Sequence, residues 1–439
     1  MKNSSSRQLG LITVISLVAG GMIGSGIFAL PAALARFGGI SLIGWMVAAL
    51  GALTLAQIMG KLSKAIPENG GSYIYTKRAF GDFPSFLVAW GYWMTLWTTN
   101  AAIGLTFAGY LSVFFPVIEH PWLSVLVALG VLWSLSLLNT YSVRASGNLQ
   151  VVTTLLKIIP VLVVAIGGIF FFNPDHFFPF NLSGESSLQA ISGATVLCFF
   201  AFLGIETATI PADNIKNPEK NISKGTMIGV ILVILLYIFS TISLFGAISP
   251  GELAHSIAPL SDTATRIFGG KARYWVAAGA CISTFGALNV WILVQGQISR
   301  SLALDGYLPK SISQLNRKGS PGMGIAVSSS VASILLLANS SKGFADLYEF
   351  MVELTTLTSL LFYLSAASAF AYFAFTRQLG FQRNFREIGL GILGMIFSFW
   401  IIFGSGLEIV IWCVLGVLLG VPFYFWKKYK MGKLNDLKI

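Results

Sequence analysis

An acidic residue, Glu206, lies inside a long apolar stretch near the middle of the chain. A carboxylate within hydrocarbon is costly, and such residues usually line a cavity, a gate or a proton path. Burial also disfavours the charged form of a carboxyl group, which would suit a proton-sensitive switch. Glu206 is therefore a candidate for proton-linked chemistry. The alternative is a structural acid that is hydrogen-bonded to a neighbouring helix.

A basic residue, Lys157, lies inside another apolar stretch, shortly before Pro160. A buried lysine is driven toward its neutral form and can then exchange a proton near neutral pH. The alternative is a lysine that extends to the membrane surface or pairs with a neighbouring group.

Glycine residues followed by proline interrupt two of the apolar stretches. One contains Gly24 and Gly26 ahead of Pro31, and the other contains Gly204 ahead of Pro211. Glycine costs ~1 kcal/mol per helical site, and proline removes a hydrogen bond from the helix. Paired interruptions in matching halves of a chain indicate the binding site of a secondary transporter. Close helix packing around small residues is the alternative.

Helices that cross a membrane must position these residues. The chain has 439 residues, of which 55% are hydrophobic and 10% charged, whereas a soluble domain carries about 25% charged residues. Apolar runs of ~20 residues recur along the whole length, and lipid leaves their backbone groups no partner except within a helix. We predict one all-α transmembrane domain over residues 1–439 with twelve spans, at about 10–36, 40–62, 84–114, 121–141, 148–172, 188–211, 225–248, 274–300, 323–339, 347–376, 388–405 and 407–426.

The net charge of +11 is distributed unevenly among the predicted loops. If the N-terminus is cytoplasmic, most of the 28 Lys and Arg residues fall in inside segments. Cytoplasmic loops are enriched in these residues, so both termini are expected in the cytoplasm. The expected location is the plasma membrane, which in bacteria is the inner membrane. The charge is thus a topology signal, and no nucleic-acid partner is expected.

Other classes of membrane protein fit the sequence less well. An enzyme would need clustered catalytic groups, but neither His-Glu-x-x-His nor Gly-x-Ser-x-Gly occurs, and no histidine lies within a predicted span. No cofactor or metal is expected. A channel would need a filter-like loop, which is not apparent. The sequence alone does not exclude a nutrient receptor that does not transport its ligand. The three cysteines fall within predicted spans and are expected to be packing residues.

Several motifs occur in an order and at a spacing that resemble the amino acid–polyamine–organocation superfamily. Within it the chain looks most like the basic amino acid/polyamine antiporter branch, which includes exchangers of arginine for agmatine. The resemblance spans nearly the whole chain. The motifs are Gly24-Ser25-Gly26-Ile27-Phe28, Pro67-Glu68-Asn69-Gly70-Gly71-Ser72-Tyr73, Gly204-Ile205-Glu206-Thr207-Ala208 and Lys216-Asn217-Pro218-Glu219.

The resemblance implies a LeuT-like fold of two inverted five-helix repeats, about 10–172 and 188–376, with helices 11 and 12 outside them at about 388–426. Helices 1 and 6 would be broken, and alternating access would occur around a site between helices 1, 3, 6, 8 and 10. The lipid bilayer is the expected surrounding, and a homodimer is implied by the resemblance alone.

The resemblance also implies a binding site for an amino acid or amine. Unwinding at Ser25, Gly26 and Ile27 would expose N–H groups to a carboxylate, and carbonyl groups of Met22, Phe200 and Leu203 would receive the amino group. The matching side-chain pocket comprises Thr95, Leu96, Asn100, Ile103, Phe200, Trp291 and Thr355. Phe200 stands where the arginine/agmatine exchanger has tryptophan, and its smaller ring is a weaker cation–π partner. Arginine specificity is therefore open.

The resemblance assigns Glu206 to a gate with tyrosines that correspond to Tyr92 and Tyr363. Lys157 resembles a lysine that takes the place of a bound cation in some proton-coupled relatives, which favours proton-linked or sodium-free exchange. The acidic residues Asp346, Glu349 and Glu353 are expected either to line an external vestibule or to lie at the membrane interface.

Together these observations predict a secondary transporter that exchanges amino acids or amines of cationic or broad specificity, as in arginine/agmatine exchange. The alternative is a proton-coupled permease of the same fold for neutral amino acids.

Overall fold

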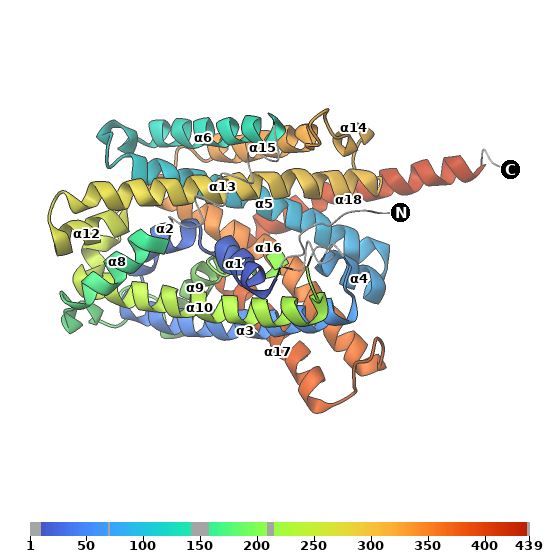
Figure 1. Cartoon of the computed structure of the whole chain (residues 1–439), viewed down its shortest axis with the longest axis horizontal. Helices are drawn as coiled ribbons and strands as arrows, with labels where there is room; N and C mark the ends of the chain where they lie inside the picture. Colours follow the sequence, from blue (N-terminus) through green and yellow to red (C-terminus); the bar gives the residue numbers. More distant parts are fainter. Residues whose placement is uncertain (1–9, 69–70, 142–157, 209–214, 437–439) are drawn as a thin grey trace.

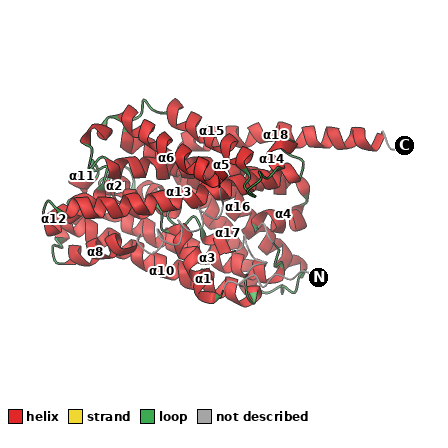
Figure 2. Cartoon of the chain, turned by 45° about the horizontal axis from the view of Figure 1, so that its top comes forward, coloured by secondary structure: helices red, strands yellow, loops and turns green. Residues whose placement is uncertain are grey.

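The computed structural model describes residues 10–68, 71–141, 158–208 and 215–436. Their regular structure is helical, and helices run side by side through the length of the molecule (Figure 2). The predicted all-helical fold is therefore confirmed.

Each of the twelve predicted spans has a helical counterpart. They are α1 (Leu11–Met22) with α2 (Ser25–Ala35), α3 (Ser41–Ala65), α5 (Asp82–Leu111), α6 (Pro121–Tyr141), α8 (Ile158–Ile169), α9 (Ser187–Phe200) with η4 (Ile205–Ala208), α10 (Pro218–Ala247), α13 (Ala272–Leu304), α15 (Gly322–Ala338), α16 (Phe344–Thr376), α17 (Phe385–Gly404) and α18 (Gly406–Asp436). Shorter helices connect them: η1 (Gly38–Ile40), α4 (Ser72–Phe80), η2 (Pro116–Glu119), η3 (Pro174–Phe177), α11 (Pro250–Leu253), α12 (Pro259–Phe268) and α14 (Lys310–Ser313).

Among the described residues, eight helices are long and apolar enough to cross a membrane, and the bent pair α1 and α2 makes a ninth. The other counterparts are α8 and α15, which are shorter, and α5, which has 30 residues but carries many polar side chains. Neighbouring helices bury α5 at Thr95, Thr99 and Asn100, so this helix needs less apolar surface than one that faces lipid.

Some helices extend beyond the predicted boundaries. Helix α10 begins at Pro218, and α18 continues to Asp436, so that it projects from the body in Figure 1. Helix α4 was not predicted. These extensions carry charged residues that a search for apolar spans excludes, although charge is no obstacle to a helix outside the hydrocarbon.

The contacts between helices have an internal symmetry. Helix α10 packs on α1 as α3 packs on α9, and α5 contacts α6 as α13 contacts α15. Helix α6 contacts α13 as α15 contacts α5, and the pairs α3 with α10 and α6 with α15 lie side by side (Figure 1). Two equivalent five-helix units would give these pairings. Because each unit would cross the membrane five times, an odd number, the second unit would be inverted relative to the first.

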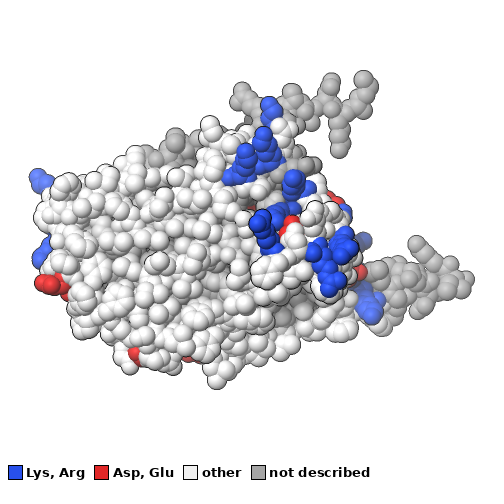
Figure 3. Space-filling view, turned by 90° about the horizontal axis from the view of Figure 1, so that it is seen from below, with Lys and Arg blue, Asp and Glu red and all other residues white. Residues whose placement is uncertain are grey.

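The two ends of the molecule differ in charge. Helices α4 and α14 and the end of α18 lie at one end, and α12 lies at the other (Figure 1). Lys and Arg side chains gather over the end that holds α4 and α14 (Figure 3). We call this the basic end and the opposite one the α12 end.

Candidate functional site

The first helix break falls at Gly24, where the sequence predicted an interruption, but it ends before Ser25. Helix α1 ends at Met22, α2 begins at Ser25, and the two axes meet at 40°. The prediction that Ser25, Gly26 and Ile27 are unwound is therefore wrong, because they form the first turn of α2. The N–H groups of a first turn lack partners within their helix, so a helix start offers the donors that unwinding was expected to expose.

The second break follows Phe200, where α9 ends. A turn leads to Gly204, whose φ of +115° lies in a region that side chains other than hydrogen rarely adopt. The 3-10 helix η4 follows and carries Glu206. The second interruption thus falls where the sequence placed it.

The two breaks touch one another through backbone atoms. A Cβ atom added at Gly204 would lie 2.9 Å from the carbonyl carbon of Gly21 and 3.0 Å from the nitrogen of Met22. A Cβ atom added at Gly26 would lie 2.9 Å from the Cβ atom of Ala201. These glycines therefore allow the half-helices to approach more closely than any other residue would permit.

A small cavity of about 20 Å³ lies between the breaks, which is room for about one water molecule. We call it the central cavity. Seven predicted binding residues line it: Met22, Ser25, Gly26, Ile103, Phe200, Leu203 and Trp291. The lining also includes residues that the sequence reasoning missed, namely Gly21, Gly24, Thr99 and Ala201. Thr99 could have been found, because it lies one helical turn before Ile103 on the same face of α5.

The other predicted binding residues do not line this cavity. Thr95 donates to the Thr358 hydroxyl over 3.0 Å, and Asn100 Nδ2 donates to Gln295 Oε1 over 2.7 Å. Thr355 bonds the carbonyl of its own helix at Met351. Successive residues of a helix point about 100° apart, so Thr99 faces the cavity while its neighbour Asn100 links helices instead. Leu96 and Ile27 are buried away from the cavity.

Two of the three carbonyl groups predicted to receive an amino group already have partners. The Tyr237 hydroxyl donates to the Met22 carbonyl over 2.7 Å, and the Leu203 N–H donates to the Phe200 carbonyl over 3.1 Å. In this conformation both carbonyl groups therefore have one hydrogen-bond donor, and their role in binding an amino group stays a prediction. A carbonyl oxygen has two lone pairs, so each could accept a second donor.

A buried hydrogen-bond network surrounds Glu206. The Tyr92 hydroxyl donates to Glu206 Oε1 over 2.9 Å, and the Tyr363 hydroxyl donates to Oε2 over 2.5 Å. The N–H of Gly204 also donates to Oε2, over 3.1 Å. Glu206 and both tyrosines are nearly inaccessible to solvent. The structure therefore joins α5, α16 and the second break through a single carboxylate. We call Tyr92, Glu206 and Tyr363 the triad.

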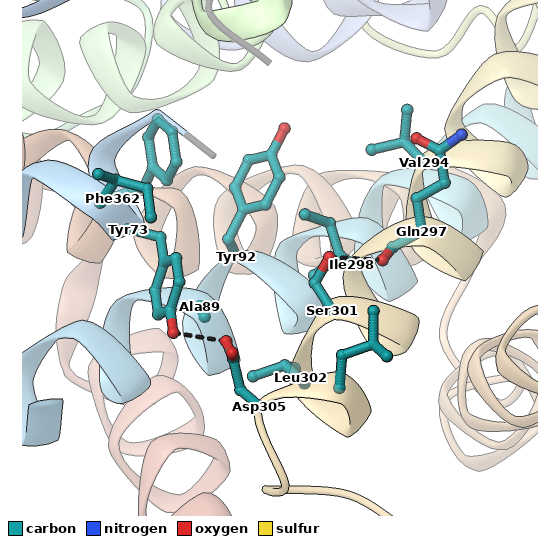
Figure 4. Close-up of a pocket in the computed structure, with 12 residues that line it drawn as sticks. Tyr73, Ala89, Tyr92, Val294, Gln297, Ile298, Ser301, Leu302, Asp305 and Phe362 are labelled. Carbon is teal, nitrogen blue, oxygen red and sulfur yellow. Dashed lines mark hydrogen bonds between the residues drawn. The ribbon is translucent and has the colours of Figure 1, made fainter. Parts of the chain in front are cut away.

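A much larger cavity, of about 420 Å³, lies on the far side of the triad, toward the basic end. Residues of α4, α5, α13 and α16 line it, among them Tyr92 and Phe362 (Figure 4). The Tyr73 hydroxyl donates to Asp305 Oδ2 over 2.5 Å, while the Tyr92 hydroxyl points away from this pair (Figure 4). Burial raises the pKa of Tyr73, so its hydroxyl stays protonated as a donor. We call this cavity the vestibule.

Ion pairs join the broken helix to α16 at the α12 end. Arg36, directly after α2, donates to Asp346 Oδ1 over 2.9 Å and to Glu349 Oε2 over 2.6 Å. The sequence predicts that these acids line an external vestibule or lie at the membrane interface, and it does not indicate their partner. Deeper in the protein, the Tyr110 hydroxyl donates to the Phe28 carbonyl over 2.7 Å and accepts from the Leu260 N–H over 3.1 Å. We call these contacts the outer closure.

The predicted role of Lys157 falls outside the described residues, which resume at Ile158. It remains a prediction from the sequence.

Comparison with known proteins assigns the family. A family model described as amino acid permease matches residues 9–424. The chain belongs to the amino acid permease family. This permease is 31% identical to the cadaverine/lysine antiporter of Escherichia coli K12, over 92% of its own length and 91% of the relative's. It is 27% identical to the putrescine transporter PotE of Haemophilus influenzae, over 99% of the permease and 100% of that relative.

These matches decide several of the sequence predictions. The superfamily and its basic amino acid/polyamine antiporter branch are confirmed, because the relatives are antiporters or transporters of this branch. The permease is a multi-pass membrane transporter and not an enzyme. The relatives come from bacteria and cover nearly the whole chain.

Proposed function

We propose that this permease is an antiporter that exchanges a basic amino acid for a decarboxylated amine across the bacterial inner membrane. The observation that carries the proposal is the contact between the two helix breaks, which enclose a cavity next to the triad. The named relatives support amines of the cadaverine and putrescine class more than agmatine. Phe200, in place of the tryptophan of arginine/agmatine exchangers, points the same way.

In this proposal the backbone of the breaks recognises the amino acid. The N-terminus of α2, at Ser25 and Gly26, carries the positive end of the helix dipole and binds the carboxylate. Trp291 and Phe200 lie in the cavity wall and provide aromatic faces for a cationic group, worth ~0.5–2 kcal/mol. A substrate larger than one water molecule requires the cavity to expand, so binding is coupled to movement of the half-helices.

The triad would act as the inner gate. It separates the central cavity from the vestibule, because Tyr92 lines the vestibule and Glu206 bonds Gly204 at the break. Release of substrate toward the vestibule then requires the two tyrosines to leave the carboxylate. If Glu206 carried a proton, one of its two acceptor oxygens would become a donor and the network would loosen.

The conformation described here would be closed at the outer side. We assign the basic end to the cytoplasm because cytoplasmic loops are enriched in Lys and Arg, and both termini would then lie inside. The vestibule then opens toward the cytoplasm, and the outer closure seals the external side. Lys157 would take the place of a bound cation, so that exchange would be proton-linked and would not need sodium. An unchanged transport rate and pH response of the Lys157→Ala variant would exclude this role.

A second candidate function is proton-coupled uptake of neutral amino acids. It is favoured by one observation: within the described structure, the lining of the central cavity contains no acidic residue that could bind a second ammonium group. A cationic side chain would therefore depend on aromatic faces or on Glu206 just beyond the lining.

Counterflow into proteoliposomes tests the proposal. Purified permease is reconstituted with internal cadaverine, putrescine, agmatine or buffer alone, and uptake of labelled lysine, ornithine, arginine and leucine is measured. Exchange predicts uptake of a basic amino acid that depends strictly on an internal amine. Net uptake of leucine driven by an inward proton gradient into buffer-loaded liposomes would instead establish the second function. Liposomes without protein provide the background.

A further inference from the structure

The α12 end carries another cavity, distinct from the central cavity and the vestibule. It has a volume of about 380 Å³, within the range of about 300–1,000 Å³ that is typical of small-molecule sites. It lies between α11, α12 and the start of α13, in the loop region that follows α10. Its lining residues are Ile248, Glu252, Leu253, Ser256, Asp262, Thr265, Arg266 and Arg273, and none of them lines the central cavity or the vestibule. We call it the outer pocket.

Opposite charges face the outer pocket without touching one another. Glu252 and Asp262 contribute carboxylates, and Arg266 and Arg273 contribute guanidinium groups. In the part of the chain that the structure describes, none of these four residues forms an ion pair within 4.0 Å. The pocket therefore presents two positive and two negative groups to a space that separates them.

Two of these charged groups are only partly satisfied. Arg273 Nε is buried and has no hydrogen-bond partner. Asp262 accepts a hydrogen bond from the Ser256 hydroxyl over 2.5 Å, and burial raises its pKa although Ser256 and Arg273 act to lower it. A buried donor without a partner and a partly desolvated carboxyl group are both costly. Each would be stabilised by a ligand group of the opposite charge.

We propose that the outer pocket binds a small zwitterion, with its anionic group at Arg266 and Arg273 and its ammonium group at Glu252 and Asp262. An anion alone would face two carboxylates, and a cation alone would face two guanidinium groups, so a ligand with both charges fits best. A free amino acid and a phosphoethanolamine lipid headgroup share this chemistry. The site does not depend on the proposed exchange, because it shares no residue with the central cavity.

Hydrogen–deuterium exchange of the loop region at residues 249–273 tests the proposal. Full-length permease is placed in nanodiscs of phosphatidylglycerol, which lacks an ammonium group, and L-lysine or cadaverine is added. These probes differ by a carboxylate, so lysine is expected to slow exchange in the loop and cadaverine is not. In the Arg273→Gln variant the lysine concentration needed for protection should rise about tenfold or more, because a charge-assisted hydrogen bond is lost.

The matched control is Lys271→Gln, which removes the same charge from an exposed side chain that does not line the pocket. It should keep the protection of the original chain. Glu252→Gln provides a second variant on the opposite wall and should also weaken the effect of lysine. Unchanged thermal unfolding of the variants would show that they fold.

A further arm adds phosphatidylethanolamine to the nanodiscs. Protection that appears with this lipid and without lysine, and that Arg273→Gln removes, would support the site with the headgroup as its occupant. The proposal is overturned if neither lysine nor the lipid protects the loop, if cadaverine protects it equally, or if the protection survives Arg273→Gln. Failure of lysine exchange in proteoliposomes would leave each of these outcomes interpretable, because they do not require transport.

Discussion

Different interactions close the central cavity on its outer and inner sides. The outer closure combines partly exposed ion pairs of Arg36, whose side chain is 39% accessible, with helix packing around Tyr110. The inner closure consists of the triad, where two hydroxyl groups and a backbone N–H meet one buried carboxylate. The vestibule lies directly beyond the triad. The cavity at the outer closure, which Arg36 and Tyr348 line and which is separate from the outer pocket, measures only about 20 Å³.

This difference indicates where substrate exchange is controlled. Exposed ion pairs are typically worth ~0–1 kcal/mol, and salt weakens them. Hydrogen bonds to a buried charge are worth ~1.5–3 kcal/mol each and are hardly affected by salt. The inner closure should therefore be thin and strong, and sensitive to single substitutions. The outer closure should be thick, with its stability spread over many contacts.

The largest effect is expected where the two breaks touch. Gly204→Ala would introduce a Cβ atom 2.9 Å from the Gly21 backbone at a φ of +115°, and such strain costs of order 1–3 kcal/mol before the clash is counted. Counterflow uptake should fall to the protein-free background. The control is Gly130→Ala in α6, where a Cβ atom meets nothing within 4 Å. Normal uptake by Gly204→Ala would show that the breaks need not be in contact.

A smaller but still large effect is expected at Glu206. Glu206→Gln keeps the size of the side chain and removes the charge that strengthens its bonds to Tyr92 and Tyr363, so exchange should fall by about 10- to 100-fold. Its dependence on pH should also flatten. The pH profile of counterflow is the measurement, with Glu349→Gln at the outer closure as the matched acid. An unaltered rate and profile would leave Glu206 as a structural acid.

Substitutions of the two tyrosines should show how tightly efflux is coupled to uptake, separately from the rate of exchange. Tyr363→Phe and Tyr92→Phe each remove one donor to Glu206, and the Tyr363 bond is shorter, at 2.5 Å against 2.9 Å. A gate that opens more readily should leak, so substrate efflux without external substrate should rise by about tenfold in Tyr363→Phe and by less in Tyr92→Phe. Equal leak in both variants, or none, would contradict the triad as a gate. The control is Tyr429→Phe on α18, which makes the same substitution outside the triad and should not change the leak.

The sequence predicted the spans and the paired breaks because these follow from local composition. Apolar length defines a span, and glycine with proline interrupts a helix, wherever the rest of the chain lies. The triad was predicted through resemblance to a family, since nothing local connects Glu206 to Tyr363, which lies 157 positions away.

Other features depend on packing that the sequence does not display. The first break falls at Ile23 and Gly24, next to the place where Gly204 packs against the backbone of Gly21 and Met22. Motif matching locates a residue along a helix but not the direction of its side chain, so it put Asn100 in the cavity in place of Thr99. Arg36 gave no signal, because its partner Glu349 lies 313 positions away.

The smallest effect is expected at the outer closure. Arg36→Gln breaks its pairs with Asp346 and Glu349, and two partly exposed pairs at ~0.2–1 kcal/mol each should shift the balance toward an outward-open form only a few-fold. The half-saturating external lysine concentration should fall by about that factor. Salt near 1 M, where the Debye length is ~3 Å, should produce the same shift in the original chain and none in the variant.

Lys342→Gln is the matched control for this prediction, because among the described residues Lys342 forms its ion pair with Glu408 of α18, over 3.7 Å, and not with the acids that bind Arg36. It should leave the half-saturating concentration unchanged. If Arg36→Gln instead abolished exchange, as Glu206→Gln nearly should, the ion pairs would carry the outer closure by themselves. If it had no effect at any salt concentration, packing around Tyr110 would hold the outer side closed alone. Either result would replace the contrast between a strong inner gate and a distributed outer one.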